Sequence, residues 1–364
     1  MKVSTLQENL NKSLNIVSRA VSTKSNLEIL GYILLKTENG MIKVSSTNLE
    51  IGVSSYVGGK VDKTGEIAVP ARLFVDLISS VPNKKIEIEV ENGVINIKSE
   101  NFKSNIKGLP AEEFPLIPQP KGKVNFKLKK SSLKEAILSV VFSAAPDESR
   151  PVLSGVYLNI KDNNLFFAAT DSYRLAEKKI KLEGKNTDIE IIIPARSLIE
   201  LSRVLEGEGN VEVSIDENQA LFKTDDVEFT TRLIEGKYPD YKKIIPESSE
   251  IKIKIKKGEL LNAVKMASLF SRETTNSIRF LLKQKGVLEI SSPESQIGGS
   301  ISDLSVETEG KGGEVFFNSK YVLDILNNMK EEELVFEMSD KVSACVFRNE
   351  KDNDYIYIVM PLRT

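Results

Sequence analysis

The sequence predicts an α+β protein of three repeated domains, each with an antiparallel sheet and two helices. Helix-like segments in the same register begin 124 residues apart, at Pro70, Pro194 and Asn318. Turn-forming residues follow these helices at the same interval, at Asn92, Asp216 and Asp340, between alternating apolar runs such as IEIEV and INIK. Identity between the copies is low, so the prediction depends on independent features that share one register.

Each repeat opens with an amphipathic helix, in STLQENLNKSLNIVSRAV, SSLKEAILSVVFSAA and GELLNAVKMASLFS. We expect a serine or glycine to start each one. A hairpin follows, with its turn expected at Asn39-Gly40, Asn163-Asn164 and Lys285-Gly286. The second helix and a second hairpin complete the repeat, so the helices would cover one side of the sheet.

Proline-rich stretches separate the repeats, in LPAEEFPLIPQPKGK and YPDYKKIIPESSE. We therefore expect domains at residues 1–122, 123–247 and 248–364. Repetition alone does not distinguish a plain scaffold from a ring or an array.

Histidine is absent from the 364 residues, which removes the usual general base and the commonest transition-metal ligand. No GxxxxGK[ST], GxGxxG or DxDxDG pattern is present. We therefore expect no enzyme activity, no cofactor and no metal site. A metal-dependent enzyme acting on nucleic acid would need paired carboxylates. Asp171 and Asp240 have no adjacent partner carboxylate and are better explained as capping or loop residues.

The chain has no apolar signal segment and no stretch that approaches a membrane span, so we expect a cytoplasmic protein without a membrane partner. Its single cysteine, Cys345, lies in the apolar run VSACVF and is expected to be buried. A net charge of −2 argues against an ordinary DNA-binding domain. It still allows basic side chains to gather on one surface.

Four segments carry a family resemblance: SRPVLSGV at 149–156, ATDSYRLA at 169–176, LIEGKYPDYKKIIP at 233–246, and the final YIVMPLRT. Over essentially its full length the chain resembles the bacterial DNA polymerase III beta subunit, the β sliding clamp. The resemblance implies the DNA clamp fold and a head-to-tail dimeric ring. It implies a processivity factor that encircles double-stranded DNA without sequence preference and tethers the replicative polymerase. An ATP-driven clamp loader and other proteins with a clamp-binding motif are the further partners implied.

The resemblance places helices around the DNA, and one repeated position agrees with this. Arg72, Arg196 and Lys320 each follow a helix start by two residues, where a cation opposes the helix dipole. A charge on an exposed helical face is the alternative explanation for each. Further candidates from the helices and adjoining loops are Lys12, Arg19, Lys24, Lys134, Arg150, Arg203, Lys265 and Lys330. Scattered cations attract phosphates without reading bases, as sliding requires.

The resemblance also implies a partner-peptide cleft between the second and third domains. Its matching residues are Leu153, Thr170, Ser172, Tyr173, Arg174, Leu175, Pro239, Lys243, Ile244, Val342, Ala344, Ile358, Met360, Pro361 and Leu362. Ordinary core packing is the alternative for the apolar members. The apolar run from Met360 to Leu362, so near the end of the sequence, favours a tether or a ligand. Ser172-Tyr173 and Lys243 replace the family's commoner Gly-His and Arg, which we interpret as tuning of the cleft rim.

Three positions match the family's ring interface. They are Ile106 in the first domain and Leu269 and Phe270 in the third. A purely structural scaffold would share the repeat but would have no reason for repeated cations or an apolar end.

Overall fold

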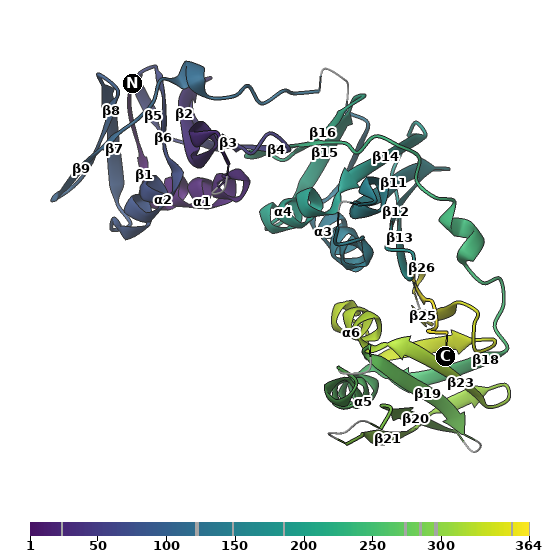
Figure 1. Cartoon of the computed structure of the whole chain (residues 1–364). Helices are drawn as coiled ribbons and strands as arrows, with labels where there is room; N and C mark the ends of the chain where they lie inside the picture. Colours follow the sequence, from purple (N-terminus) through teal and green to yellow (C-terminus); the bar gives the residue numbers. More distant parts are fainter. Residues whose placement is uncertain are drawn as a thin grey trace. The chain divides into compact units, whose positions relative to one another are not determined.

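The computed structural model describes residues 1–22, 25–120, 124–147, 149–184, 186–272, 275–283, 286–294, 298–350 and 352–363 (Figure 1). The chain divides into two compact units. Unit 1 contains residues 1–133 and 196–233, and unit 2 contains residues 134–195 and 234–364. The second expected repeat therefore contributes strands to both units.

Unit 1 holds two antiparallel sheets. One has the order β5 (Lys60–Lys63), β1 (Lys2–Leu6), β7 (Lys85–Glu91), β8 (Val94–Ser99) and β9 (Phe102–Lys107). The other has the order β10 (Phe126–Lys129), β15 (Asn210–Ile215), β16 (Gln219–Lys223), β17 (Val227–Arg232), β4 (Ile51–Val57), β3 (Met41–Thr47), β2 (Tyr32–Glu38) and β6 (Glu66–Pro70). The β17–β4 pair thus joins the second repeat to the first.

Unit 2 is built in the same way. Its larger sheet has the order β14 (Ile189–Pro194), β11 (Gly155–Lys161), β12 (Asn164–Thr170), β13 (Arg174–Lys181), β26 (Asp352–Val359), β25 (Cys345–Asn349), β24 (Glu333–Met338), β18 (Ile251–Lys256) and β22 (Glu307–Glu309). The smaller has the order β21 (Ile301–Ser305), β20 (Val287–Ser291), β19 (Ser277–Lys283) and β23 (Gly313–Asn318). Here the β13–β26 pair joins the second repeat to the third.

Two helices accompany each repeat. They are α1 (Gln7–Val17), α2 (Ala71–Ser80), α3 (Lys130–Val140), α4 (Ala195–Val204), α5 (Lys257–Phe270) and α6 (Ser319–Asn328). In unit 1, α1 packs beside α2, and in unit 2, α5 packs beside α6 on the same side of the strands (Figure 1). Each pair turns an apolar stripe inward, and the fully buried Leu10, Leu14 and Phe74 belong to the first. Burying such a side chain stabilises the fold by about 2 kcal/mol.

The first helix of each repeat does not start as we expected. A strand runs directly into it, so Ser4 lies in β1 and the helix begins at Gln7, Lys130 or Lys257, not at a serine or glycine. The first helical N–H donates to a carbonyl of the neighbouring chain segment, at Lys84 (2.9 Å), Gly209 (3.0 Å) and Glu332 (2.7 Å) respectively. Because this bond satisfies one of the free N–H groups at the helix start, no capping side chain is needed there.

The hairpin turns agree with the sequence to within one residue. Asn39-Gly40 and Asn92-Gly93 have positive φ at both residues, as a tight hairpin requires. In the second repeat the left-handed residues are Asp162 and Asn163, so the turn lies one position before the expected one. Both residue types tolerate this conformation. Lys285, expected in a further turn, lies outside the described residues.

Candidate functional site

An apolar cluster in unit 2 gathers predicted cleft residues that are far apart in the sequence. Leu153 from a short 3₁₀ helix (Pro151–Ser154), Leu175 from β13 and Ile358 from β26 are buried in it, with Ala344 packed against it. Leu175 and Ile358 are opposite one another in the β13–β26 ladder. The strand pair that joins the second and third repeats therefore forms part of the cluster.

Three tyrosines that we did not predict as site residues also belong to this cluster. The Tyr157 ring stacks on the Tyr238 ring with 5.0 Å between centroids, and Tyr241 meets both rings edge-on. The Tyr241 hydroxyl donates to the buried carboxylate of Glu177 at 2.5 Å. Burial, and then the charge of Glu177, raise the pKa of Tyr241, so the hydroxyl keeps its proton and remains a donor. Tyr238 and Tyr241 lie within the matched segment GKYPDYKK, which could have identified them.

The turn between β12 and β13 forms a rim beside the cluster. We call residues Thr170 to Arg174 the rim turn. Tyr173 at its tip is 58% exposed, and its ring stacks on Tyr321 of α6 with 6.4 Å between centroids. The Arg174 guanidinium lies 4.7 Å from the centre of the Tyr321 ring and pairs with Asp171 (3.0 Å) and with Asp324. Sequence reasoning missed Tyr321 and Asp324, because α6 is distant in the chain.

The C-terminal segment passes the rim turn with its backbone held at two points. The Met360 N–H donates to the Tyr173 carbonyl (2.8 Å), and the Leu362 N–H donates to the Phe316 carbonyl on β23 (2.8 Å). The side chains of Met360, Pro361 and Leu362 are all partly exposed. The expected tether thus exists as backbone hydrogen bonds, and the apolar side chains remain accessible.

The other predicted cleft residues have varied surroundings. Ile244 and Val342 are exposed apolar side chains, at 44% and 62%. Thr170 is buried, while Ser172, Pro239 and Lys243 are exposed, and Lys243 pairs with Asp240 at 2.9 Å. Arg150, which we predicted to face DNA, donates to the Ser172 hydroxyl (2.9 Å) and the Asp171 carbonyl (3.4 Å). The structure therefore brings Arg150 to the rim turn.

The three cations at the repeated helix position are equivalent in structure. Arg72, Arg196 and Lys320 are each the second residue of a helix, and each is exposed. Among the other candidates, Lys134 is partly exposed, Lys265 is exposed, and Lys24 lies outside the described residues. Four candidates form ion pairs: Lys12 with Asp226, Arg19 and Arg203 with Glu200, and Lys330 with Glu135.

The predicted ring-interface residues lie at sheet edges or close to them. β9, which contains Ile106, is the last strand of its sheet, and Ile106 itself is buried within unit 1. Leu269 is 50% exposed at the end of α5, and Phe270 is partly exposed beside it. The nearby edge strand β21 presents Ile301, which is 72% exposed.

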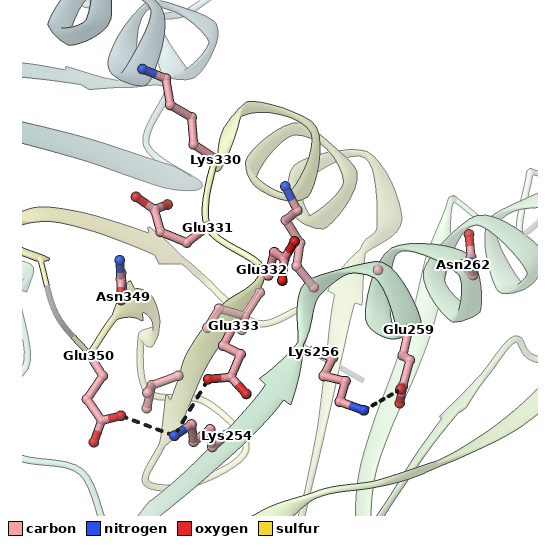
Figure 2. A pocket seen from close by; sticks show the side chains of 14 residues that line it. Lys254, Lys256, Glu259, Asn262, Lys330, Glu331, Glu332, Glu333, Asn349 and Glu350 are labelled. Carbon is pink, nitrogen blue, oxygen red and sulfur yellow. Dashed lines mark ion pairs between the residues drawn. The ribbon is translucent and has the colours of Figure 1, made fainter.

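A hollow of about 960 Å³ in unit 2 is lined by residues of β18, α5 and β24 and by other residues near them, and not by the apolar cluster (Figure 2). Its lining is charged, and its cations are largely neutralised from within unit 2. Lys254 pairs with Glu333 and Glu350, and Lys256 pairs with Glu259 (Figure 2). The Lys257 ammonium donates to the Met329 carbonyl. Such a self-neutralised surface offers little net charge to a ligand. Among the described residues no acidic, cysteine or histidine cluster suits a metal ion, and no helix is long and apolar enough to cross a bilayer.

Comparison with family models and curated proteins gives one consistent result. Models of the DNA polymerase III beta subunit match in three parts: the N-terminal domain at residues 1–118, the central domain at 127–240 and the C-terminal domain at 242–363. The beta sliding clamp of Staphylococcus aureus is 32% identical, with 96% of each chain covered. That of Staphylococcus epidermidis is 30% identical with the same coverage.

Solved structures of the same kind superpose closely. The DNA polymerase sliding clamp of Bacillus subtilis matches with a TM-score of 0.94 and 30% identity, over 100% of this chain and 99% of that one. The sliding clamp of Pseudomonas aeruginosa bound to griselimycin matches with a TM-score of 0.96 and 29% identity over 100% of both chains.

Proposed function

This chain belongs to the family of DNA polymerase III beta subunits, the bacterial sliding clamps. We propose which of its surfaces close the ring, face DNA and bind partner proteins. It is a DNA polymerase processivity factor, and it is not an enzyme. A clamp retains its polymerase by enclosing the duplex, so the chain must close a ring, face DNA with cations and bind partner proteins. We propose that it does so in the cytoplasm, with the domains at residues 1–122, 123–247 and 248–364.

The observation that carries the proposal is that successive repeats are joined by the same kind of strand pair. We call these pairs, β17–β4 and β13–β26, the joints. Within unit 1, Glu228 of β17 lies opposite Ser54 of β4, and within unit 2, Ile356 of β26 lies opposite Glu177 of β13. The equivalent strands of the first and third repeats, β9 and β21, are each at the edge of a sheet. Each presents unpaired backbone groups, which favour pairing with another chain.

We infer that β9 of one chain pairs with β21 of a second chain, and that two such joints close a head-to-tail ring. Matched through their hairpin partners, Lys103 corresponds to Glu228, and Ile301 corresponds to Ser54 and to Glu177, the residue opposite Ile356. Lys103 of one chain would then lie opposite Ile301 of the other. Leu269 and Phe270, beside β21, would add apolar contact. Two chains joined twice in this way would form a closed head-to-tail dimer.

We propose that the helices face the enclosed duplex through Arg72, Arg196 and Lys320. Their shared position in three helices supports this, because a cation there is not explained by the helix dipole. Lys12, Arg19, Lys24, Lys134, Lys265, Lys330 and Arg203 remain weaker candidates for the same surface. With a net charge of −2, the chain should hold DNA by enclosure and not by affinity.

The experiment for this function compares circular and linear DNA. The protein, loaded on a nicked circle by the organism's clamp loader, should be retained during gel filtration and released when the circle is cut. The triple variant Arg72→Glu, Arg196→Glu and Lys320→Glu should load poorly and show a weaker salt dependence. The control protein carries the same change, Lys to Glu, at three exposed lysines on strands: Lys98, Lys161 and Lys252. Persistence on cut DNA would overturn enclosure, and equal loading of the two triple variants would overturn the assignment of the DNA surface.

We further propose that the accessible apolar residues around the cluster form the site for polymerase peptides. Tyr173, Ile244, Val342 and the side chains from Met360 to Leu362 supply apolar surface, and Arg174 and Tyr321 supply a polar edge. A peptide with an apolar anchor would bury its side chain there. The clamp loader and other clamp-binding proteins would compete for the same surface. The griselimycin-bound relative supports a ligand site in this family.

Removal of residues 360–364 tests this site. We expect the truncated protein to lose binding of a fluorescein-labelled peptide from the replicative polymerase, yet to remain a dimer, because the proposed ring joints use other strands. Its stability should fall by about 2 kcal/mol, because two backbone hydrogen bonds are lost. Unchanged peptide affinity in a dimeric truncation would exclude the segment from the site. Loss of the dimer as well would show that the segment is structural.

A further inference from the structure

The rim turn is held by side-chain hydrogen bonds to its own backbone. Oδ1 of the buried Asp171 accepts from the N–H groups of Tyr173 (2.9 Å) and Arg174 (3.0 Å). The Thr170 hydroxyl accepts from the Ser172 N–H (3.1 Å) and donates to the Arg174 carbonyl (2.6 Å). Together these bonds hold Ser172 at a φ of 80°, a conformation that side-chain-bearing residues rarely adopt.

The first repeat contains the same turn at residues 47–51. Asn48 Oδ1 accepts from the N–H groups of Glu50 (3.0 Å) and Ile51 (2.8 Å). The Thr47 hydroxyl accepts from the Leu49 N–H (3.0 Å) and donates to the Ile51 carbonyl (2.8 Å). Leu49 has a φ of 75°. Since asparagine holds this turn with the same bonds, the turn itself does not require a carboxylate.

The acid in the second repeat has an additional contact. Asp171 Oδ2 accepts from the Arg174 Nε at 3.0 Å, and the guanidinium so held extends over the ring of Tyr321. The same turn aims the Tyr173 carbonyl at the Met360 N–H. One side chain therefore fixes the rim, its arginine and the anchor of the apolar C-terminal segment.

We propose that Asp171 is the positioning residue of the partner-peptide site. It keeps Ser172 in the left-handed conformation, and this conformation orients Tyr173 and Arg174 toward the residues that would receive a peptide. Because Asp171 is buried, we assign it to positioning and not to contact with the peptide. This role rests on the proposed peptide-binding function. It adds that Asp171 keeps the rim turn in its binding conformation before a partner binds.

The test measures binding of the fluorescein-labelled polymerase peptide by fluorescence anisotropy to four full-length proteins. Asp171→Ala removes the two turn bonds and the arginine contact, and we expect at least about tenfold weaker binding, which corresponds to about 1.4 kcal/mol. Asn48→Ala removes the equivalent turn bonds in the first repeat. It should lower the melting temperature similarly and leave peptide affinity within about twofold, because it lies in unit 1.

A rescue separates positioning from general stability. Glycine adopts positive φ without strain, so Asp171→Ala combined with Ser172→Gly should recover part of the lost affinity, the part that depends on the turn and not on the Asp171–Arg174 contact. Sedimentation should show an intact dimer for every variant. Unchanged affinity in Asp171→Ala, equal losses in Asn48→Ala, or no recovery with glycine would each overturn the role of Asp171. Absence of peptide binding by the unaltered protein would instead overturn the peptide site itself.

Discussion

Cys345 shows how burial determines the chemistry of a single residue. Its side chain is fully buried, and burial, followed by the charge of Asp340, raises the pKa of the thiol to about 12. The reactive thiolate is therefore nearly absent at neutral pH. The sequence predicted this burial from the apolar run around Cys345, because a short apolar segment is stabilised when it is removed from water in the core.

We predict that Cys345 does not react with a disulfide reagent in the folded protein at pH 8. It should react fully once the protein is unfolded in guanidinium, because the pKa then returns to the ordinary range. Thiol absorbance in native and denaturing buffer measures both states. Rapid reaction of the native protein would show that the β25 strand opens readily.

Glu228 is a buried carboxylate at the joint between the first two repeats. It accepts hydrogen bonds from Gln119 (2.7 Å) and Lys223 (3.0 Å), and the Tyr56 hydroxyl donates to it at 3.3 Å. We predict that Glu228→Ala lowers the free energy of unfolding by about 2 kcal/mol, because the hydrogen bonds to this buried carboxylate are lost while its exposed partners Gln119 and Lys223 can turn to water. Urea titration measures this, with the exposed Glu217→Ala as a control expected to change little. A loss below about 0.5 kcal/mol would show that Lys223 and Gln119 find other partners.

At the scale of elements, strands decide where helices begin. Residues 4–6 contain helix-compatible residues, yet they pair with β7 and form β1. The local sequence pattern cannot reveal this. The hydrogen bonds that hold these residues in a strand come from β7, about 80 residues away in the sequence. The start of α2 was predicted correctly to within a residue although it also follows a strand directly, because Pro70 at the end of β6 marks the helix start in the sequence itself.

The edge strands allow a register test. We predict that the double variant Lys103→Cys and Ile301→Cys forms covalent dimers in high yield with a short bismaleimide, because the two positions would be opposite across the joint. The unreactive Cys345 gives little background. Lys103→Cys with Ser302→Cys is the control, since neighbouring positions point to opposite faces of a strand. Equal yields in the two proteins would refute the proposed register.

For the molecule as a whole, the proposed ring would cover the β9 and β21 edges with a second copy of the chain. We predict that Leu269→Asp with Phe270→Asp yields a monomer at micromolar concentration in sedimentation, because the joint would bury unpaired charge. The control, Leu138→Asp, changes an exposed apolar residue on α3 and should leave the dimer intact. A persistent dimer in the double variant would move the interface elsewhere.

The repeat, the antiparallel hairpins, the second helix of each repeat and the family could all be predicted from the sequence. These features arise from local spacing of apolar, turn-forming and charged residues. Three features could be seen only in the folded chain: where the first helices begin, that Arg150 lies at the rim turn, and that Tyr321 and Asp324 contact Arg174. Those outcomes depend on hydrogen bonds and ion pairs between segments up to 150 residues apart. A linear pattern does not encode such contacts, because they exist only once the strands have paired.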